Sequence, residues 1–101
     1  MQLLTKELEA RFQEIGTQEN IKDPIVIAKY FNPSGTWYAT EYHPEDKTFF
    51  GYVSIFGDEC DEWGYFSLQE LQEYKGKFGL GIERDLYCGE FPISKVLKGN
   101  E

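Results

Sequence analysis

The sequence has 101 residues, of which 41% are hydrophobic, and a formal net charge of −8 at pH 7. A chain of this length forms one domain, and we assign residues 1–101 to it. Binding to nucleic acid or to anionic lipid depends on basic side chains, so this charge argues against direct contact with either.

The negative charge is concentrated in the middle third of the chain. Residues 41–73 contain nine acids and one base, whereas residues 1–40 and 74–101 are close to neutral. The first twelve residues alternate charged side chains with leucines, which is not the pattern of a secretory signal. The sequence also lacks a run of roughly 20 apolar residues that would span a membrane. We therefore expect a cytoplasmic protein that does not bind membranes.

The first predicted element is an amphipathic helix at residues 6–15. Leu8, Phe12 and Ile15 recur at helical spacing and form one apolar face. Thr5 is suited to cap the first backbone amides, and Gly16 is suited to end the helix in a left-handed turn. The pattern is typical of a half-buried helix that lies on a sheet.

The next part of the chain is rich in strand signals. β-branched and aromatic residues predict strands at residues 25–31, 36–42, 48–56 and 63–66. Turns at residues 32–35 and 43–47 join the first three strands into antiparallel hairpins. Aromatic residues occur at both parities of the second and third strands, so both sheet faces are expected to be at least partly covered. One face is assigned to the first helix, and the other to C-terminal segments or to a partner.

The C-terminal third is predicted to return to helix. Ser67 and Glu70 form a capping-box pattern that begins a second helix at residues 68–75. Residues 78–88 are predicted to be extended, and residues 91–97 to form a last helical turn with Pro92 at its first position. The whole pattern predicts an α+β fold. We expect a small, mostly antiparallel sheet of three to five strands, with the N-terminal helix and the second helix packed on it.

Catalytic and metal-binding signals are weak. Cys60 and Cys88 are too few for a disulfide framework and too far apart for a CxxC motif, so we interpret them as free thiols. With His43 they also lack the spacing of a zinc site. G-x-S-x-G, H-E-x-x-H and Walker motifs are absent from the sequence. We therefore predict no metal, no cofactor and no catalytic residue, and we favour a binding role over an enzymatic one.

Five sequence blocks, taken together, span nearly the whole chain. They are LLTKEL (3–8), WYATEY (37–42), FFGYV (49–53), GYFSLQEL (64–71) and IERDLYCGEFPIS (82–94). In this order they resemble the domain-of-unknown-function family 2958, small proteins carried largely by bacterial plasmids, phages and integrative elements. The resemblance implies an accessory gene of a mobile element, where inhibitors of host defence are common. It implies no specific activity.

The most visible candidate site is acidic. Two exposed like charges about 4 Å apart cost roughly 1 kcal/mol in water, so crowded acids add nothing to fold stability. A solvated loop explains them, and so does a surface that binds a protein partner with a basic surface. The residues assigned to this partner-binding surface are Glu45, Asp46, Asp58, Glu59, Asp61, Glu62 and Trp63. We expect a non-catalytic acidic module, such as an inhibitor of a host defence protein or another nucleic-acid-handling protein.

The alternative is a small-molecule-binding or enzymatic domain with a pocket near Glu41, His43 and Arg84. Strand alternation turns Arg84 away from its two acidic neighbours, which leaves Glu41 as a candidate partner. Arginine holds a carboxylate or a phosphate by two parallel hydrogen bonds. His43 would act as an acid or base only if a partner orients it. A third hypothesis is a homodimer formed through an uncovered sheet face, so both monomer and homodimer stay open.

Overall fold

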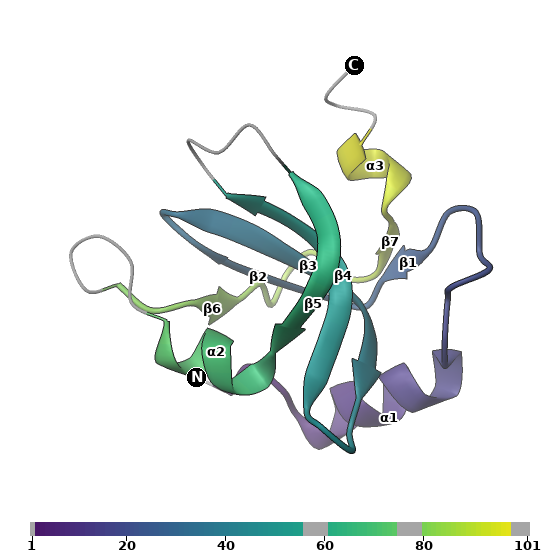
Figure 1. The fold of residues 1–101 in the computed structure, drawn as a ribbon, viewed down its shortest axis with the longest axis horizontal. Helices are drawn as coiled ribbons and strands as arrows, with labels where there is room; N and C mark the ends of the chain where they lie inside the picture. Colours follow the sequence, from purple (N-terminus) through teal and green to yellow (C-terminus); the bar gives the residue numbers. More distant parts are fainter. Residues whose placement is uncertain (1, 56–60, 75–79, 98–101) are drawn as a thin grey trace.

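The computed structural model of the protein describes residues 2–55, 61–74 and 80–97 (Figure 1). In chain order its elements are α1 (Lys6–Ile15), β1 (Ile25–Val26), β2 (Ala28–Asn32), β3 (Gly35–His43), β4 (Thr48–Ile55), β5 (Glu62–Ser67), α2 (Leu68–Glu73), β6 (Glu83–Arg84), β7 (Phe91–Pro92) and α3 (Ser94–Leu97). Five strands form an antiparallel sheet in the order β5-β4-β3-β2-β6, and β1 pairs with β7 in a second sheet. The predicted α+β fold is confirmed.

The predicted N-terminal helix is confirmed at both ends. Thr5 Oγ1 accepts a hydrogen bond from the Leu8 amide at 3.1 Å, which satisfies one of the free amides of the first turn. Gly16 ends α1 with a φ of 70°, and its amide donates to the Phe12 carbonyl at 2.8 Å. Between these caps, Phe12 is the buried residue that fixes α1 to the sheet.

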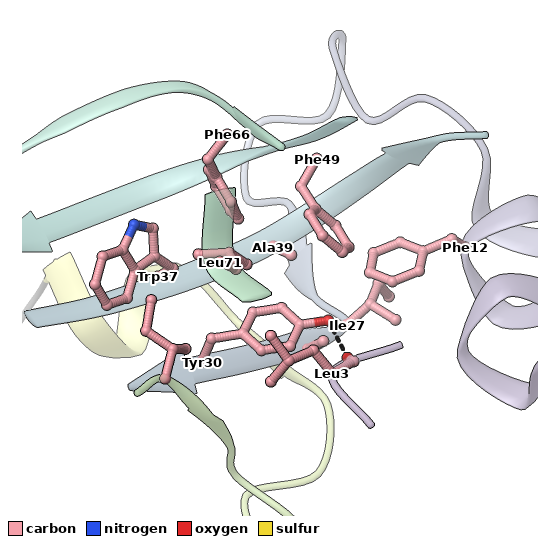
Figure 2. Packing of buried hydrophobic residues seen from close by; sticks show 11 residues of the cluster. Leu3, Phe12, Ile27, Tyr30, Trp37, Ala39, Phe49, Phe66 and Leu71 are labelled. Atoms are coloured by element: carbon pink, nitrogen blue, oxygen red, sulfur yellow. Dashed lines mark hydrogen bonds between the residues drawn. The ribbon is translucent and has the colours of Figure 1, made fainter. Parts of the chain in front are cut away.

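The main core lies on one side of the five-stranded sheet, which we call the inner face. Figure 2 shows the Phe49 ring between side chains from α1 and from neighbouring strands. Its centroid lies 5.5 Å from those of Tyr30 and Phe66 and 5.9 Å from that of Phe12. The Tyr30 hydroxyl donates to the Leu3 carbonyl at 2.7 Å, and burial raises the pKa of this tyrosine well above its usual range. The full cluster comprises Leu3, Phe12, Ile27, Ala28, Tyr30, Trp37, Ala39, Phe49, Phe66, Leu71 and Ile82.

The opposite side of the sheet, the outer face, is only partly covered. A smaller cluster of Val26, Tyr52 and Ile93 forms where β1, β7 and α3 lie against it. Tyr38 and Phe91 pack beside this cluster, with their rings edge to face at 6.3 Å. C-terminal segments therefore cover part of the second face, as expected from the aromatic residues at both strand parities.

The predicted strand at residues 25–31 is wrong in detail. The predicted strand 25–31 divides into β1 and β2, because the Ile27 amide donates to the Ala39 carbonyl while β1 turns to pair with β7. Val26 then packs on the outer face and Ile27 on the inner face. A single strand that paired with β3 over its whole length could not also pair with β7.

Pro92 does not begin a helix. It lies in β7 opposite Ile25, in a two-stranded sheet where a residue without an N–H is tolerated at the edge. α3 begins at Ser94, whose amide and hydroxyl both donate to the Asp23 carboxylate, at 3.0 and 2.7 Å. Asp23, distant in sequence, therefore caps this turn.

The second capping box is confirmed. Ser67 Oγ accepts from the Glu70 amide at 2.9 Å, and the Glu70 carboxylate accepts from the Ser67 amide at 3.0 Å. α2 ends at Glu73, shorter than the predicted helix, and residue 75 lies outside the described part of the chain. Within the predicted extended segment 78–88, the pairing in the described part is limited to β6. None of the helices in the described ranges is long and apolar enough to cross a membrane.

Candidate functional site

A β-bulge at Thr40 determines which side chains reach the outer face. Ala39 pairs with Gly51 and Glu41 pairs with Phe50, so Thr40 is an extra residue in β3. Strict alternation would place Glu41 on the inner face beside Ala39. The bulge turns Glu41 outward instead and turns Tyr42 into the core, where its ring lies 4.9 Å from that of Phe49. His43 then lies on the same side as Glu41.

The outer face carries a pocket of about 480 Å³ next to the bulge. One wall is the segment that connects α1 to β1, at the right of Figure 1, and the other is formed by β3, β4 and β5. This volume is within the range of about 300–1,000 Å³ that small ligands and side chains occupy in protein pockets. The lining residues are Thr17, Gln18, Glu19, Ile21, Lys22, Pro24, Thr40, Glu41, His43, Phe50, Trp63 and Tyr65.

Gln18 attaches the connecting segment to the sheet. Its side-chain Nε2 donates to the Thr40 carbonyl at 2.7 Å and to the Ile25 carbonyl at 2.9 Å. Its Oε1 accepts from the Ile25 amide at 2.7 Å, and the residue is only 5% exposed. Because a buried amide without partners is costly, these three bonds hold the wall of the pocket against the bulge.

Glu41 is a nearly buried carboxylate at the base of the pocket, 8% exposed. Its Oε2 accepts from the Gln18 amide at 2.9 Å and from the Thr17 hydroxyl at 3.4 Å. Within the described residues, both hydrogen bonds to Glu41 go to Oε2. The other oxygen, Oε1, lies 3.3 Å from Nε2 of His43.

His43 lies between two carboxylates. Its Nδ1 is 3.8 Å from Oε1 of Glu45, on the turn that follows β3. Its Nε2, near Glu41, is buried, and the approach is too poorly aligned to count as a hydrogen bond. The site therefore contains a buried ring nitrogen without a hydrogen-bond partner in the described part of the chain.

Three aromatic residues form the wall on β4 and β5. Phe50 and Trp63 are stacked with centroids 6.0 Å apart, and Phe50 and Tyr65 meet edge to face at 4.9 Å. Trp63 is 39% exposed and Tyr65 is 70% exposed, and Ile21 faces the same pocket from the opposite wall. Exposed aromatic side chains gathered at a pocket are typical of a binding surface.

The structure does not bring the predicted acidic residues together. Glu45 and Asp46 lie on the turn between β3 and β4, whereas Asp61 and Glu62 lie at the start of β5. β4 and β5 are antiparallel, so the two groups lie at opposite ends of these strands, roughly 20 Å apart. Asp58 and Glu59 lie outside the described residues. Of the predicted surface, Trp63 lines the pocket and Glu45 borders it through His43.

The predicted trio of Glu41, His43 and Arg84 is divided. Glu41 and His43 share the pocket, but Arg84 lies on β6, two strands away from β3. Its Nε donates to the Gln2 carbonyl at 3.1 Å, and it lines a different cavity together with Cys88. Cys60 lies outside the described residues, and in the described ranges we find no cluster of three His, Cys, Asp or Glu side chains suited to hold a metal ion.

Several pocket residues were not predicted. Tyr65 is two positions from Trp63 on a strand and so shares its face, a signal present in the sequence. Phe50 is paired with Tyr65 in the register of β4 and β5, which the sequence alone does not give. Gln18 and Lys22 lie in the polar segment between the first helix and the first strand, and no sequence pattern distinguishes them from their neighbours.

Comparison with known proteins identifies a family. A search of curated proteins and a search of solved structures each found no match. The model of a family described as "Protein of unknown function (DUF2958)" matches residues 3–100, nearly the whole chain. This agrees with the resemblance read from the five sequence blocks. The chain therefore belongs to the DUF2958 family.

Proposed function

We propose that this protein is a non-catalytic module that binds a partner protein with a basic surface through the outer face of its sheet. The observation that carries the proposal is the exposure of Trp63 and Tyr65 beside a pocket with a nearly buried carboxylate, Glu41. Exposed aromatic side chains supply contact area, and they are enriched at the centres of protein interfaces.

The charge of the chain supports a basic partner. The net charge is −8, and exposed acids lie at both ends of the outer face: Glu45 and Asp46 at one end, Asp61 and Glu62 at the other. Such a field accelerates the encounter with a cationic surface and weakens as salt screens it. The acids thus assist association from two sides, and the aromatic pocket between them provides the short-range contacts.

We further propose that the partner is a nucleic-acid-handling protein, such as a host defence enzyme. A protein that binds nucleic acid has a basic cleft, and an acidic module is complementary to it. The family resemblance, to proteins of bacterial plasmids, phages and integrative elements, agrees with an inhibitor of host defence. The partner's cleft would then be closed to nucleic acid while the module is bound.

The test is affinity capture from bacterial cells, followed by binding measurements with the purified partner. Trp63→Ala with Tyr65→Ala is expected to lower affinity about 100-fold, since each change removes about 1–2 kcal/mol of interface contact. Tyr87→Ala is the matched control, because Tyr87 is an exposed aromatic residue that does not line the pocket. Wild-type affinity in the double variant, with a folded protein, would contradict the proposal.

Salt and charge reversal test the electrostatic part separately. Raising the salt from about 50 to about 300 mM should slow association severalfold. Replacing Asp58, Glu59, Asp61 and Glu62 with lysine should abolish capture while the protein remains folded. An association rate that is unchanged by both the added salt and the charge reversal would contradict the proposal of a basic partner.

A second candidate function is supported by the contact between Glu41 and His43 in a pocket. A carboxylate beside an imidazole is suited to bind a small molecule or to move a proton to or from it. Screening small metabolites by NMR against the pocket tests this role. Light scattering tests the remaining hypothesis, that the outer face pairs with a second copy of the chain.

A further inference from the structure

We infer that the pocket on the outer face holds one cationic side chain of the partner, a lysine ammonium or an arginine guanidinium. This inference rests on the proposed function and assigns the group that enters the site. It follows from the carboxylate at the base of the pocket, from its aromatic wall and from its charged lining residues.

The base of the pocket presents a nearly buried carboxylate with one oxygen that accepts no hydrogen bond from the described residues. Both hydrogen bonds to Glu41 go to Oε2, from the Gln18 amide and the Thr17 hydroxyl. Oε1 lies 3.3 Å from Nε2 of His43, in a geometry too poorly aligned for a hydrogen bond. A nearly buried anionic oxygen without a donor is satisfied by a group that carries both a positive charge and N–H donors.

An ammonium and a guanidinium have that property. The first has three N–H donors and the second has five, and either also neutralises the Glu41 carboxylate. A carboxylate or phosphate would instead be repelled by the Glu41 carboxylate. The base of the pocket therefore selects for cations.

The aromatic wall suits the same guest. The faces of aromatic rings attract cations within about 6 Å, and Phe50, Trp63 and Tyr65 all line the pocket. Their apolar surface also accommodates the aliphatic stem of lysine or arginine. The volume of about 480 Å³ holds such a side chain.

The charged residues around the pocket are unequal in sign. Glu19 and Glu41 line it with one base, Lys22, which is exposed on the connecting segment. Lys22 opposes the two carboxylates, because its positive charge repels a second cation. Its removal should therefore strengthen binding, whereas removal of Glu41 should weaken it.

The experiment titrates the 101-residue chain with blocked amino acids and follows the ¹H–¹⁵N spectrum, including the Trp63 indole. The probes are N-acetyl-arginine methylamide and N-acetyl-lysine methylamide, and the neutral probe of similar length is N-acetyl-norleucine methylamide. The cationic probes are expected to give saturable shifts at the pocket residues. Equal affinity for the norleucine compound, or absence of saturation by all three, would overturn the inference.

Variants locate the effect. Glu41→Gln keeps the acceptor oxygen for the Gln18 amide and should weaken the cationic probes about fivefold, while Lys22→Gln should strengthen them about twofold. Glu83→Gln, an identical loss of charge on β6, should change nothing. Should Glu41→Gln fail to fold, Tyr65→Ser serves in its place, because this exposed side chain contributes little to the core and its loss should also weaken the probes. Probe affinity unchanged in the folded Glu41→Gln or Tyr65→Ser variant would overturn the inference.

The captured partner separates this inference from the proposed function. Partner binding that is lost with Trp63→Ala and Tyr65→Ala but unchanged in Glu41→Gln would leave the protein-binding function standing and overturn the cation pocket. Loss in both variants supports both proposals. Retention in both would contradict both.

Discussion

The two faces of the five-stranded sheet differ in how they are covered, although both carry aromatic side chains. Phe49 and Phe50 are neighbours on β4 and point to opposite sides. Phe49 is surrounded by rings from α1 and adjacent strands, whereas Phe50 lies in a pocket wall beside exposed Trp63 and Tyr65. The inner face therefore supplies stability, and the outer face carries the proposed binding site.

The pocket forms where the segments that cover the outer face end. Val26 and Ile93 pack over Tyr52 at one part of this face, where β1, β7 and α3 lie against it. Beyond them, the face is bordered by the segment from α1 to β1, which Gln18 holds in place. Substitutions that act on one face and leave the other unchanged test this division of roles.

The largest effect is expected at Gly51, on the inner side of β4 opposite Ala39. A Cβ at this position would overlap the Tyr38 carbonyl, a backbone atom that cannot move aside. Gly51→Ala should therefore cost more than about 5 kcal/mol and remove the folded state, as judged by circular dichroism. Gly64→Ala is the matched control, because Gly64 pairs with Gly51 and a Cβ there meets no atom within 4 Å. A folded Gly51→Ala variant would show that the strands can separate at this point.

The next effect compares the neighbouring phenylalanines directly. Phe49→Ala removes a fully buried ring and should lower the free energy of unfolding by about 3–5 kcal/mol. Phe50→Ala removes a partly exposed ring and should cost about 1 kcal/mol. Urea titrations measure both. Equal losses would mean that the outer face contributes to stability as much as the inner face does.

A smaller effect is expected at the attachment of the pocket wall. Gln18→Leu leaves the Ile25 amide and the Thr40 carbonyl without their partner, at a cost of about 2 kcal/mol. Partner binding should also weaken, since the connecting segment lines the pocket. Gln13→Leu, on the exposed side of α1, is the control and should change neither property. Thermal melts and binding titrations on the two variants distinguish a local attachment from a general effect of leucine.

The smallest effect is expected at a surface ion pair, Arg11 with Glu90, that belongs to neither face of the sheet. Hydrogen bonds from Arg11 to both oxygens of Glu90 lower the pKa of that carboxyl group. Because the folded-state pKa lies below the unfolded value of about 4.3, the contribution is fully present above that pH. It is lost as the pH falls through the folded-state pKa. The pair is partly exposed, so Glu90→Gln should lower the melting temperature at pH 7 by a few degrees at most and should have a smaller effect at pH 2. An equal decrease at both pH values would show that packing, not charge, is responsible.

Local signals predicted the elements well, and long-range contacts explain the differences. Thr5 and Gly16 fix the ends of α1 because both caps act within one turn. The sequence predicts Pro92 at the start of a helix because it does not show that Asp23, some seventy positions away, caps Ser94. A helix start that depends on a distant carboxylate cannot be predicted from the residues next to it in the sequence.

The candidate site was predicted only in part for a related reason. The sequence marks Glu41, His43 and Trp63 as candidates, but it assigns them to two separate sites and places Arg84 with the first two. Their convergence depends on the extra residue at Thr40, and nothing in WYATEY marks it, since glycine and proline are absent there. Without that shift, strand alternation places Glu41 in the core, where it would have no evident use.

Because of the β-bulge in β3, we expect the structure to tolerate replacement of Thr40 by another residue type better than its deletion. If Thr40 were deleted, the strand would regain strict alternation, the carboxylate would turn toward the phenylalanine rings, and the tyrosine after it would emerge into water. The pocket of the proposed binding site would lose its carboxylate, and the interior would acquire an unpaired charge in a single step. Relatives that vary in residue type at this point can keep the same architecture, whereas a relative one residue shorter there would need a different one.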